Sequence, residues 1–380
     1  MEKYFLNNQN LTAEQELLIL VSRLTFSKCI EERAIGLIHK YNINWFDFYK
    51  LALYHKVVTL SWYNLKKLSI TYKLNLRIPK YLDELISYTY ICLEEKNKLY
   101  QNEIEIFLFE LKKRNICIIP VKGVYLIPNL YKKFGIRYSG DADFLIKQAD
   151  SKSIEEVLVS LGYVQGYYNP STKKLEKFSR AEKIKHKSFL PILAPFTKIN
   201  YENNICPYFK FDFRHSLDDS LNTKVVDRII ESYETNEYVK PAHYLIHLCS
   251  HFYEEYRHAL DIALSKDINI IKLCDIREYI IQRTKELDLD ELLAFSKEYG
   301  LEKQLYLCLY ILSIVYNDGY EDKLLANINL DNYDFINQYG ENEKQLNKWF
   351  KKTIKERFFS CGNIDELDEI PLALRKISND

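Results

Sequence analysis

Apolar positions recur at helical spacing through the first third of the chain. The segment from Thr12 to about Lys113 opens on Thr12-x-x-Gln15, a pattern typical of a capping box at the start of a helix. The clearest helix is predicted over residues 81–113, where apolar residues fall three, four and seven positions apart and Glu and Lys fill the other face. The apolar face consists of Leu82, Ile86, Leu93, Tyr100, Ile104, Phe107 and Leu111.

The pattern changes at Asn115, where short β-branched runs replace the helical spacing. NICIIPVKG, beginning at Asn115, and DADFLIK, residues 141–147, are predicted to be buried strands. Helical spacing over residues 150–161, followed by Gly162, predicts a short helix. Residues 115–215 therefore predict a small mixed α/β region. Its further expected strands are residues 163–168, 184–193 and 207–213.

Helical spacing returns after about Asn236. A segment that opens on Pro241, a residue compatible with the first turn of a helix, is followed by IKLCDIREYIIQRTKEL. The changes of pattern predict three parts. They are a helical N-terminal domain (1–114), an α/β domain (115–236) and a helical C-terminal domain (237–380). The expected fold class is α+β and mostly helical, with a small mixed sheet at its centre.

Composition and charge exclude several classes of protein. The 380 residues carry 53 Lys and Arg against 53 Asp and Glu, so no overall field attracts nucleic acid or an anionic membrane surface. The longest apolar run, residues 305–316, is about half of the roughly 20 residues that cross a bilayer, and it predicts a buried helix. The N-terminus lacks the features of a secretory signal. We therefore expect a cytoplasmic protein with no membrane segment and no polynucleotide partner.

The eight cysteines are widely spaced and form no CxxC pair. Such spacing predicts neither a zinc ribbon nor a disulfide framework. Because most of the cysteines have apolar neighbours, we expect most of them to be small buried hydrophobic residues.

Asp141 and Asp143 lie two positions apart in a predicted strand. Alternation places both carboxylates on one face, while Phe144 and Ile146 point to the core. Adjacent carboxylates repel each other unless a cation lies between them, and Mg²⁺ prefers carboxylate oxygens completed by phosphates and water. The pair predicts a metal site, with a solvated turn as the alternative.

A second candidate element is the strand FKFDFRHSL. Alternation places Lys210, Asp212 and Arg214 on one face and three phenylalanines on the other. A buried aromatic face leaves the polar face exposed or functional, and the three charges suit a metal together with a phosphate. The alternative is a solvent-exposed face of alternating charge.

The third candidate element is the turn at Lys122 and Gly123, between a predicted strand and a predicted helix that carries Pro128, Tyr131, Lys132 and Lys133. Glycine lets backbone amides approach a phosphate. Neither GxxxxGK[ST] nor GxGxxG occurs, which disfavours P-loop and Rossmann mechanisms. A lone glycine turn is common, so this element gains weight only together with the other two.

Together these elements resemble a known family. The stretch VKGVYLIPNLYKKFGIRYSGDADFLI, with Arg137 within it and FDFRHSL further on, is similar to the signature of the uncharacterised nucleotidyltransferase family, a branch of the polymerase-β-like nucleotidyltransferase superfamily. The resemblance implies a small mixed sheet with helices on one side. It also implies three carboxylates that hold two Mg²⁺ ions, which bind an incoming nucleoside triphosphate (NTP).

Carried over to this chain, the resemblance makes Asp141 and Asp143 the paired metal ligands and Asp212 the third acid. It makes the Lys122–Gly123 turn the triphosphate-binding loop. Two further expected nucleotide-binding residues are Arg137 and Arg214, the latter standing where the resemblance leads us to expect a histidine.

The predicted C-terminal helices add polar candidates. Four histidines with spacings of four, four and seven share one helical face if the helix continues that far, and they suit a zinc site, the lining of a nucleotide cleft, or ordinary packing. Lys272 and Asp275 resemble a lysine and an aspartate that the family places opposite the metal site, with a surface pair as the alternative. We include His247, Lys272 and Asp275 among the expected nucleotide-binding residues. The four histidines are His243, His247, His251 and His258.

The expected function is that of a Mg²⁺-dependent nucleotidyltransferase. It moves a nucleoside monophosphate group from an NTP, ATP by default, to a small-molecule or peptide acceptor and releases pyrophosphate. The resemblance implies a role in bacterial natural-product or modified-peptide pathways. Two alternatives are a γ-phosphoryl transferase that uses the same metal site and a catalytically silent module that senses nucleotides or binds a partner.

Overall fold

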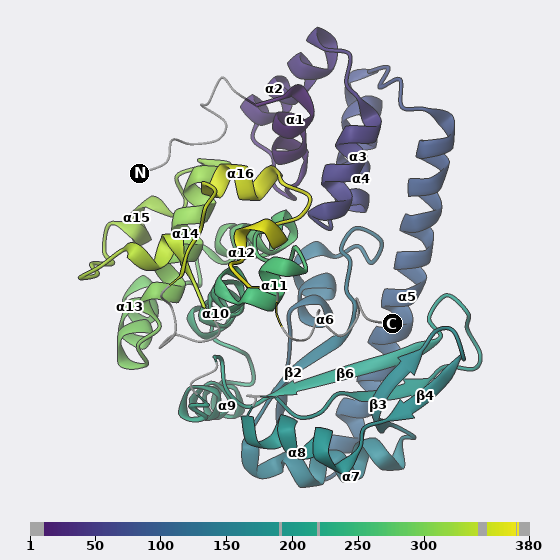
Figure 1. Cartoon of the computed structure of the whole chain (residues 1–380), viewed down its shortest axis with the longest axis vertical. Helices are drawn as coiled ribbons and strands as arrows, with labels where there is room; N and C mark the ends of the chain where they lie inside the picture. Colours follow the sequence, from purple (N-terminus) through teal and green to yellow (C-terminus); the bar gives the residue numbers. More distant parts are fainter. Residues whose placement is uncertain (1–10, 190–191, 219–220, 341–347, 370, 372–380) are drawn as a thin grey trace. The chain divides into compact units, whose positions relative to one another are not determined.

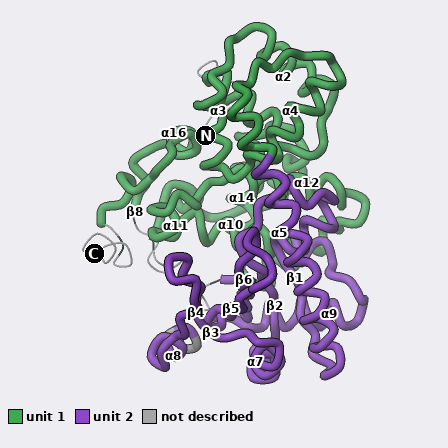
Figure 2. Tube along the Cα trace, turned by 90° about the vertical axis from the view of Figure 1, so that its right-hand side faces the viewer, with its two compact units in different colours: residues 1–87, 245–380 green, residues 88–244 purple. Residues whose placement is uncertain are grey.

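The computed structural model describes residues 11–189, 192–218, 221–340, 348–369 and 371 (Figure 1). The chain forms two compact units, one of residues 88–244 and one of residues 1–87 together with 245–380 (Figure 2). The α+β, mostly helical fold class is confirmed. The three-part division at residues 114 and 236 stays a prediction.

A six-stranded mixed sheet lies in the 88–244 unit. Its strand order is β1-β2-β6-β5-β3-β4, with β2 and β6 parallel and all other neighbours antiparallel. The predicted strands at 115–123, 141–147, 163–168 and 207–213 are confirmed, whereas β4 and β5 were not predicted. The strands are β1 (Ile118–Val121), β2 (Ala142–Ile146), β3 (Val164–Asn169), β4 (Lys174–Lys177), β5 (Phe196–Ile199) and β6 (Tyr208–Arg214).

One face of this sheet packs against helices α5 (Lys80–Lys112) and α7 (Ser151–Ser160). Phe107 of α5 lies at the centre, with ring centroids 5.6, 5.4 and 5.8 Å from those of Phe144, Phe211 and Phe213. All seven predicted apolar positions of α5 are buried. Because alternation commits Phe144, Phe211 and Phe213 to this core, the intervening residues of β2 and β6 face the opposite side.

The predicted strand at 184–193 is wrong. Residues 180–189 form helix α8 (Arg180–Phe189), residues 190–191 lie outside the described part of the chain, and Ile192 makes only an isolated bridge to Arg214. The helix begins at a capping box that the prediction overlooked. The Ser179 hydroxyl accepts from the amide of Glu182, and the Glu182 carboxylate accepts from the amide of Ser179.

The remaining helices of the sheet-bearing unit include α6 (Gly123–Leu126), which runs into a π-helical turn over Ile127–Tyr131, and α9 (Lys224–Asn236). A short 3-10 turn over Gln148–Asp150 precedes α7. Helix α9 packs against β2, and the Lys147 ammonium at the end of that strand pairs with Glu234 of α9 at 2.9 Å.

The other unit is built mainly from helices. The capping box predicted at Thr12 is confirmed. The apolar run at 305–316 lies in α14 and is buried, as predicted. No helix among the described residues is long and apolar enough to span a membrane. The N-terminal helices are α1 (Ala13–Val21), α2 (Lys28–Lys40), α3 (Trp45–Tyr54) and α4 (Val58–Tyr72). The later elements are α10 (Pro241–Arg257), α11 (Ala259–Ala263), α12 (Ile270–Arg283), α13 (Leu289–Glu298), α14 (Glu302–Tyr316), α15 (Asp322–Leu325), β7 (Gln338–Tyr339), β8 (Lys348–Trp349) and α16 (Ile354–Phe359).

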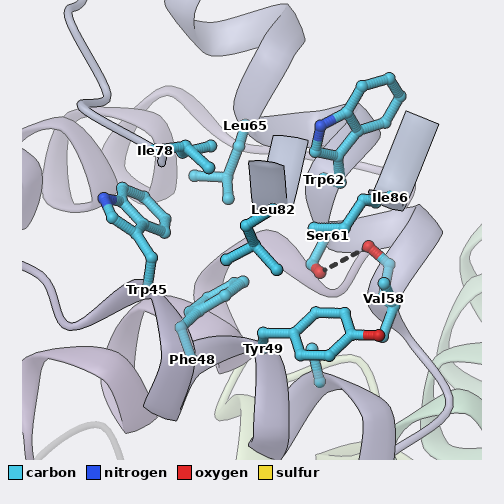
Figure 3. Close-up of a pocket in the computed structure, with 11 residues that line it drawn as sticks. Trp45, Phe48, Tyr49, Val58, Ser61, Trp62, Leu65, Ile78, Leu82 and Ile86 are labelled. Atoms are coloured by element: carbon cyan, nitrogen blue, oxygen red, sulfur yellow. Dashed lines mark hydrogen bonds between the residues drawn. The ribbon is translucent and has the colours of Figure 1, made fainter. Parts of the chain in front are cut away.

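A small apolar pocket lies among α3, α4 and the start of α5 (Figure 3). It encloses about 280 Å³ of empty space, open mouth included. Its labelled side chains are mostly aliphatic and aromatic, and its Ser61 hydroxyl already donates to the Val58 carbonyl at 3.1 Å. The pocket is therefore mostly apolar, and its Ser61 hydroxyl already has a hydrogen-bond partner.

All eight cysteines are free thiols, so the expected absence of a disulfide framework agrees with the structure. The expectation that most are buried is wrong, because only four are buried, Cys117 is half-buried and three lie at solvent-exposed positions on α2, on α5 and after α16. The buried ones are Cys206, Cys249, Cys274 and Cys308, and the exposed ones are Cys29, Cys92 and Cys361.

Candidate active site

The three predicted acids meet on the open face of the sheet. Asp143 lies in β2 directly beside Asp212 of the parallel strand β6, and Asp141 immediately precedes β2. Strands β2 and β6 run side by side in Figure 1. The alternation expected from the sequence is therefore present, with carboxylates on one face and phenylalanines on the other.

Two lysine ammonium groups lie among these carboxylates. Lys122 Nζ donates to Asp143 Oδ1 at 2.8 Å. Lys210 Nζ donates to Asp212 Oδ2 at 2.6 Å and to Asp141 Oδ2 at 3.2 Å. The sequence placed Lys210 on the same face as Asp212 but did not single it out as a site residue. Three carboxyl and two ammonium groups therefore form two hydrogen-bonded sets, which lie side by side because Asp143 is in register with Asp212.

Burial and the neighbouring charges shift the pKa values of the three acids in different directions. For Asp212, burial is the largest effect and, with the charges of Asp141 and Asp143, raises the pKa to about 7 against the pull of Lys210. Burial also raises the pKa of Asp143 despite Lys122. At Asp141, burial favours the neutral form, but Lys210 and Lys122 outweigh it and the pKa is lowered. Asp212 and Asp143 therefore hold a proton more readily than an ordinary aspartate, and Asp141 holds one less readily.

The donor set of this cluster suits a divalent cation. Among the described residues no group of three or more His, Cys, Asp or Glu side chains is already arranged around a metal position. The carboxylates instead accept hydrogen bonds from lysines, but Asp212 Oδ1 is buried and accepts none. Carboxylate oxygens are the ligands that Mg²⁺ prefers, so Asp141, Asp143 and Asp212 are the residues that would hold one.

The turn after β1 has an unusual backbone. Lys122 adopts φ 54° and ψ −130°, a conformation that non-glycine residues rarely adopt. Gly123 follows, and a Cβ at that position would lie 2.2 Å from Ser139 Oγ and 2.7 Å from Arg137 Nη1. The turn is therefore in tight contact with the segment that leads to Asp141. The predicted helix after it ends at Tyr131, so its extension to Lys132 and Lys133 is wrong: Lys132 has a left-handed backbone.

Helix α5 holds the segment between this turn and Asp141. Asn97 Nδ2 donates to the carbonyls of Phe134 and Arg137 at 2.6 and 3.0 Å. Lys96 Nζ donates to the Ser139 carbonyl at 2.9 Å. Nothing in the sequence pattern pointed to Asn97 or Lys96, because their partners lie about 40 residues away in a segment without regular structure.

Tyr100 of α5 connects this segment to β6. Its hydroxyl donates to the Gly140 carbonyl at 3.4 Å and accepts from the Lys210 amide at 3.1 Å. A single side chain therefore contacts both the residue before Asp141 and the strand that carries Asp212.

The two predicted arginines flank the cluster differently. Arg137 is buried beside Gly123 and donates to the Tyr138 carbonyl at 3.1 Å. Arg214 lies two residues beyond Asp212 on the same face of β6 and is also buried. Burial is the largest effect that lowers the pKa of the neighbouring His215, followed by the charge of Arg214. The expected role of Arg137 and Arg214 in nucleotide binding stays a prediction.

The predicted residues of the C-terminal helices belong to the other compact unit. His247 and Asp275 are buried, and Lys272 is ion-paired with Glu255. The surface-pair alternative for Lys272 and Asp275 is therefore wrong. Nucleotide binding by His247, Lys272 and Asp275 stays a prediction.

The histidine stripe is shorter than its spacing suggested. Helix α10 ends at Arg257, so His258 lies outside it and precedes α11. His243 is buried, and His251 Nε2 lies 3.6 Å from Glu255 Oε1.

Comparison with known proteins identifies the family. The family model described as uncharacterised nucleotidyltransferase matches residues 41–317, well over half of the chain. No curated protein and no solved structure matches the chain. The chain belongs to the uncharacterised nucleotidyltransferase family and is a transferase of nucleotidyl groups with an NTP as its substrate.

Proposed function

We propose that this enzyme is a Mg²⁺-dependent, cytoplasmic nucleotidyltransferase that uses ATP and modifies a small-molecule or peptide acceptor. The observation that carries the proposal is the in-register pairing of Asp143 with Asp212, with Asp141 joined to Asp212 through Lys210. The balance of 53 basic and 53 acidic residues favours a small or peptide acceptor over a polynucleotide.

The chain's own groups suit in-line transfer to a hydroxyl group. The acceptor oxygen forms a bond to the α-phosphorus of the NTP, the bond between that phosphorus and the bridging oxygen breaks, and pyrophosphate leaves. Asp212 accepts the acceptor's proton. The ammonium groups of Lys122 and Lys210 bind the phosphate oxygens of the nucleotide. A divalent cation held by Asp141, Asp143 and Asp212 supplies neutralisation of the phosphate charge.

The test follows the position of a label. The full chain is incubated with Mg²⁺, a small-molecule and peptide extract, and ATP labelled at either the α or the γ phosphorus, and then with the other NTPs. We expect the α label, and not the γ label, on an acceptor. Transfer of the γ label alone, or no transfer from any NTP, would overturn the proposal.

Matched variants assign the site. Asp141→Asn and Asp143→Asn are expected to abolish transfer while far-UV circular dichroism stays unchanged. Asp150→Asn changes an acid in the same unit that lies in the 3-10 turn Gln148–Asp150, outside the three-acid cluster, and it is expected to keep full transfer. Full transfer by either of the first two variants would contradict the site.

A further inference from the structure

The strongest additional feature of the molecule is the position of Lys210. Its ammonium group lies between Asp141 and Asp212, at 3.2 and 2.6 Å, on the face where the cation of the proposed reaction would bind. Its side chain is 34% exposed, so protein does not enclose it on all sides. Lysine carries a point charge on a flexible four-carbon stem, which suits it to exchange one anionic partner for another.

We propose that Lys210 is an exchangeable counter-cation that neutralises Asp141 and Asp212 in the metal-free enzyme and moves to the triphosphate when the metal–nucleotide complex binds. This inference rests on the proposed function and deepens it. Lys210 acts here in ligand binding, because its charge occupies the carboxylates before the metal–nucleotide complex arrives.

The first step of the argument is electrostatic. A divalent cation that enters between Asp141 and Asp212 comes close to the Lys210 ammonium, which donates to Oδ2 of both carboxylates, and like charges repel. The metal alone must therefore displace Lys210 at a free-energy cost. A triphosphate removes this cost, because its oxygens offer the displaced ammonium a charged partner.

The second step is linkage. If the triphosphate makes room for the metal by accepting Lys210, the metal increases triphosphate affinity by the same factor. Binding of the two is then cooperative without a conformational change of the backbone. Such a backbone change is not needed, because β2 and β6 are held by the aromatic core on their other face.

Removal of the Lys210 charge is expected to have opposite effects on the affinity for a divalent cation and on the affinity for a triphosphate. Lys210→Met leaves Asp141 and Asp212 open to a divalent cation but takes a donor away from the triphosphate. We expect Mn²⁺ alone to bind the variant about ten-fold more tightly than the wild type. We expect the Mg²⁺ complex of a non-hydrolysable ATP analogue to bind about ten-fold more weakly, since a hydrogen bond to a charged group contributes about 1.5 kcal/mol or more.

The chain offers a matched control. Lys198 of β5 pairs with Glu103 at 2.6 Å in the same unit, with a side-chain exposure of 30%, close to that of Lys210. Lys198→Met therefore removes a similar ion pair away from the candidate site, and we expect both affinities to stay at the wild-type value. Lys210→Arg keeps the charge and is expected to restore weak Mn²⁺ binding.

The experiment measures Mn²⁺ binding to the full chain by electron paramagnetic resonance and analogue binding by calorimetry. Asp141→Asn identifies Mn²⁺ bound at this site, and Lys210→Gln serves if Lys210→Met does not fold. A merely structural role for Lys210 predicts that both affinities fall together, or that neither changes, and either result would overturn the inference while leaving the proposed function standing. A wild-type chain that binds neither Mn²⁺ nor the analogue would overturn both.

Discussion

Gly123 provides the sharpest test of the geometry of the candidate site. An alanine Cβ at this position would lie 2.2 Å from Ser139 Oγ, 2.8 Å from Ser139 Cβ and 2.7 Å from Arg137 Nη1. Overpacking of this kind costs about 1–3 kcal/mol. Alanine regains up to about 1 kcal/mol through its better helix propensity, so we expect Gly123→Ala to destabilise the protein by up to about 3 kcal/mol.

Gly36 supplies the matched control. It lies within α2, and a Cβ there meets nothing within 4 Å. Without a clash, Gly36→Ala is expected to stabilise the protein by about 0.5–1 kcal/mol. The same chemical change is therefore predicted to have opposite signs at two helical glycines.

Urea unfolding followed by far-UV circular dichroism measures both variants. All three tryptophans lie outside residues 88–244, so tryptophan fluorescence follows the other compact unit. Ser139→Gly removes two of the three closest contacts and is expected to recover most of the loss, with a coupling of about 1 kcal/mol or more in a double-mutant cycle. If Gly123→Ala matches Gly36→Ala in stability, the inferred contact between the turn and Ser139 is wrong.

Three further predictions test other parts of the structure. Lys122→Gly and Lys122→Ala both remove the ammonium group and are expected to lose nucleotidyl transfer equally, but the glycine variant, which adopts the positive φ without strain, should be more stable by about 1 kcal/mol in urea unfolding. Asn97→Ala leaves the carbonyls of Phe134 and Arg137 without their donor and should cost about 1–3 kcal/mol in the same assay; an unchanged unfolding midpoint would contradict this. Burial is the largest effect that raises the pKa of Glu321 to about 7, so the folded state binds the extra proton between about pH 4.5 and 7. The contribution of Glu321 to stability therefore falls as pH rises through this range, and Glu321→Gln should make the measured stability less dependent on pH there.

The helices and strands of this fold were predictable from the sequence where a hydrophobic pattern repeats several times. Helix α5 extends over 33 residues, so its apolar spacing is repeated enough times to be unambiguous. Strands β4 and β5 have only four residues each, too few for alternation to stand out, and neither was predicted. The error at 184–193 arose because the capping interaction between Ser179 and Glu182 was overlooked in favour of the apolar residues that follow.

The acids of the candidate site were predictable for a local reason. Asp141 and Asp143 stand two apart, and Asp212 alternates with phenylalanines that must be buried, so strand geometry alone assigns their faces. The partners Asn97 and Lys96 were not predictable. Their hydrogen bonds depend on the path of residues 134–140, which no periodic pattern describes.

The two faces of the sheet explain why acids and cations have different freedom in this site. Phe144, Phe211 and Phe213 pack around Phe107 and are completely buried, so any shift of β2 or β6 disturbs a close-packed core. The backbones that carry Asp143 and Asp212 are fixed by the neighbouring phenylalanines of the same strands, whatever charge the open face holds. The lysines reach those carboxylates only by their flexible side chains. Any movement of charged groups within this site must therefore come through the lysine side chains, while the strands that carry the carboxylates stay in place.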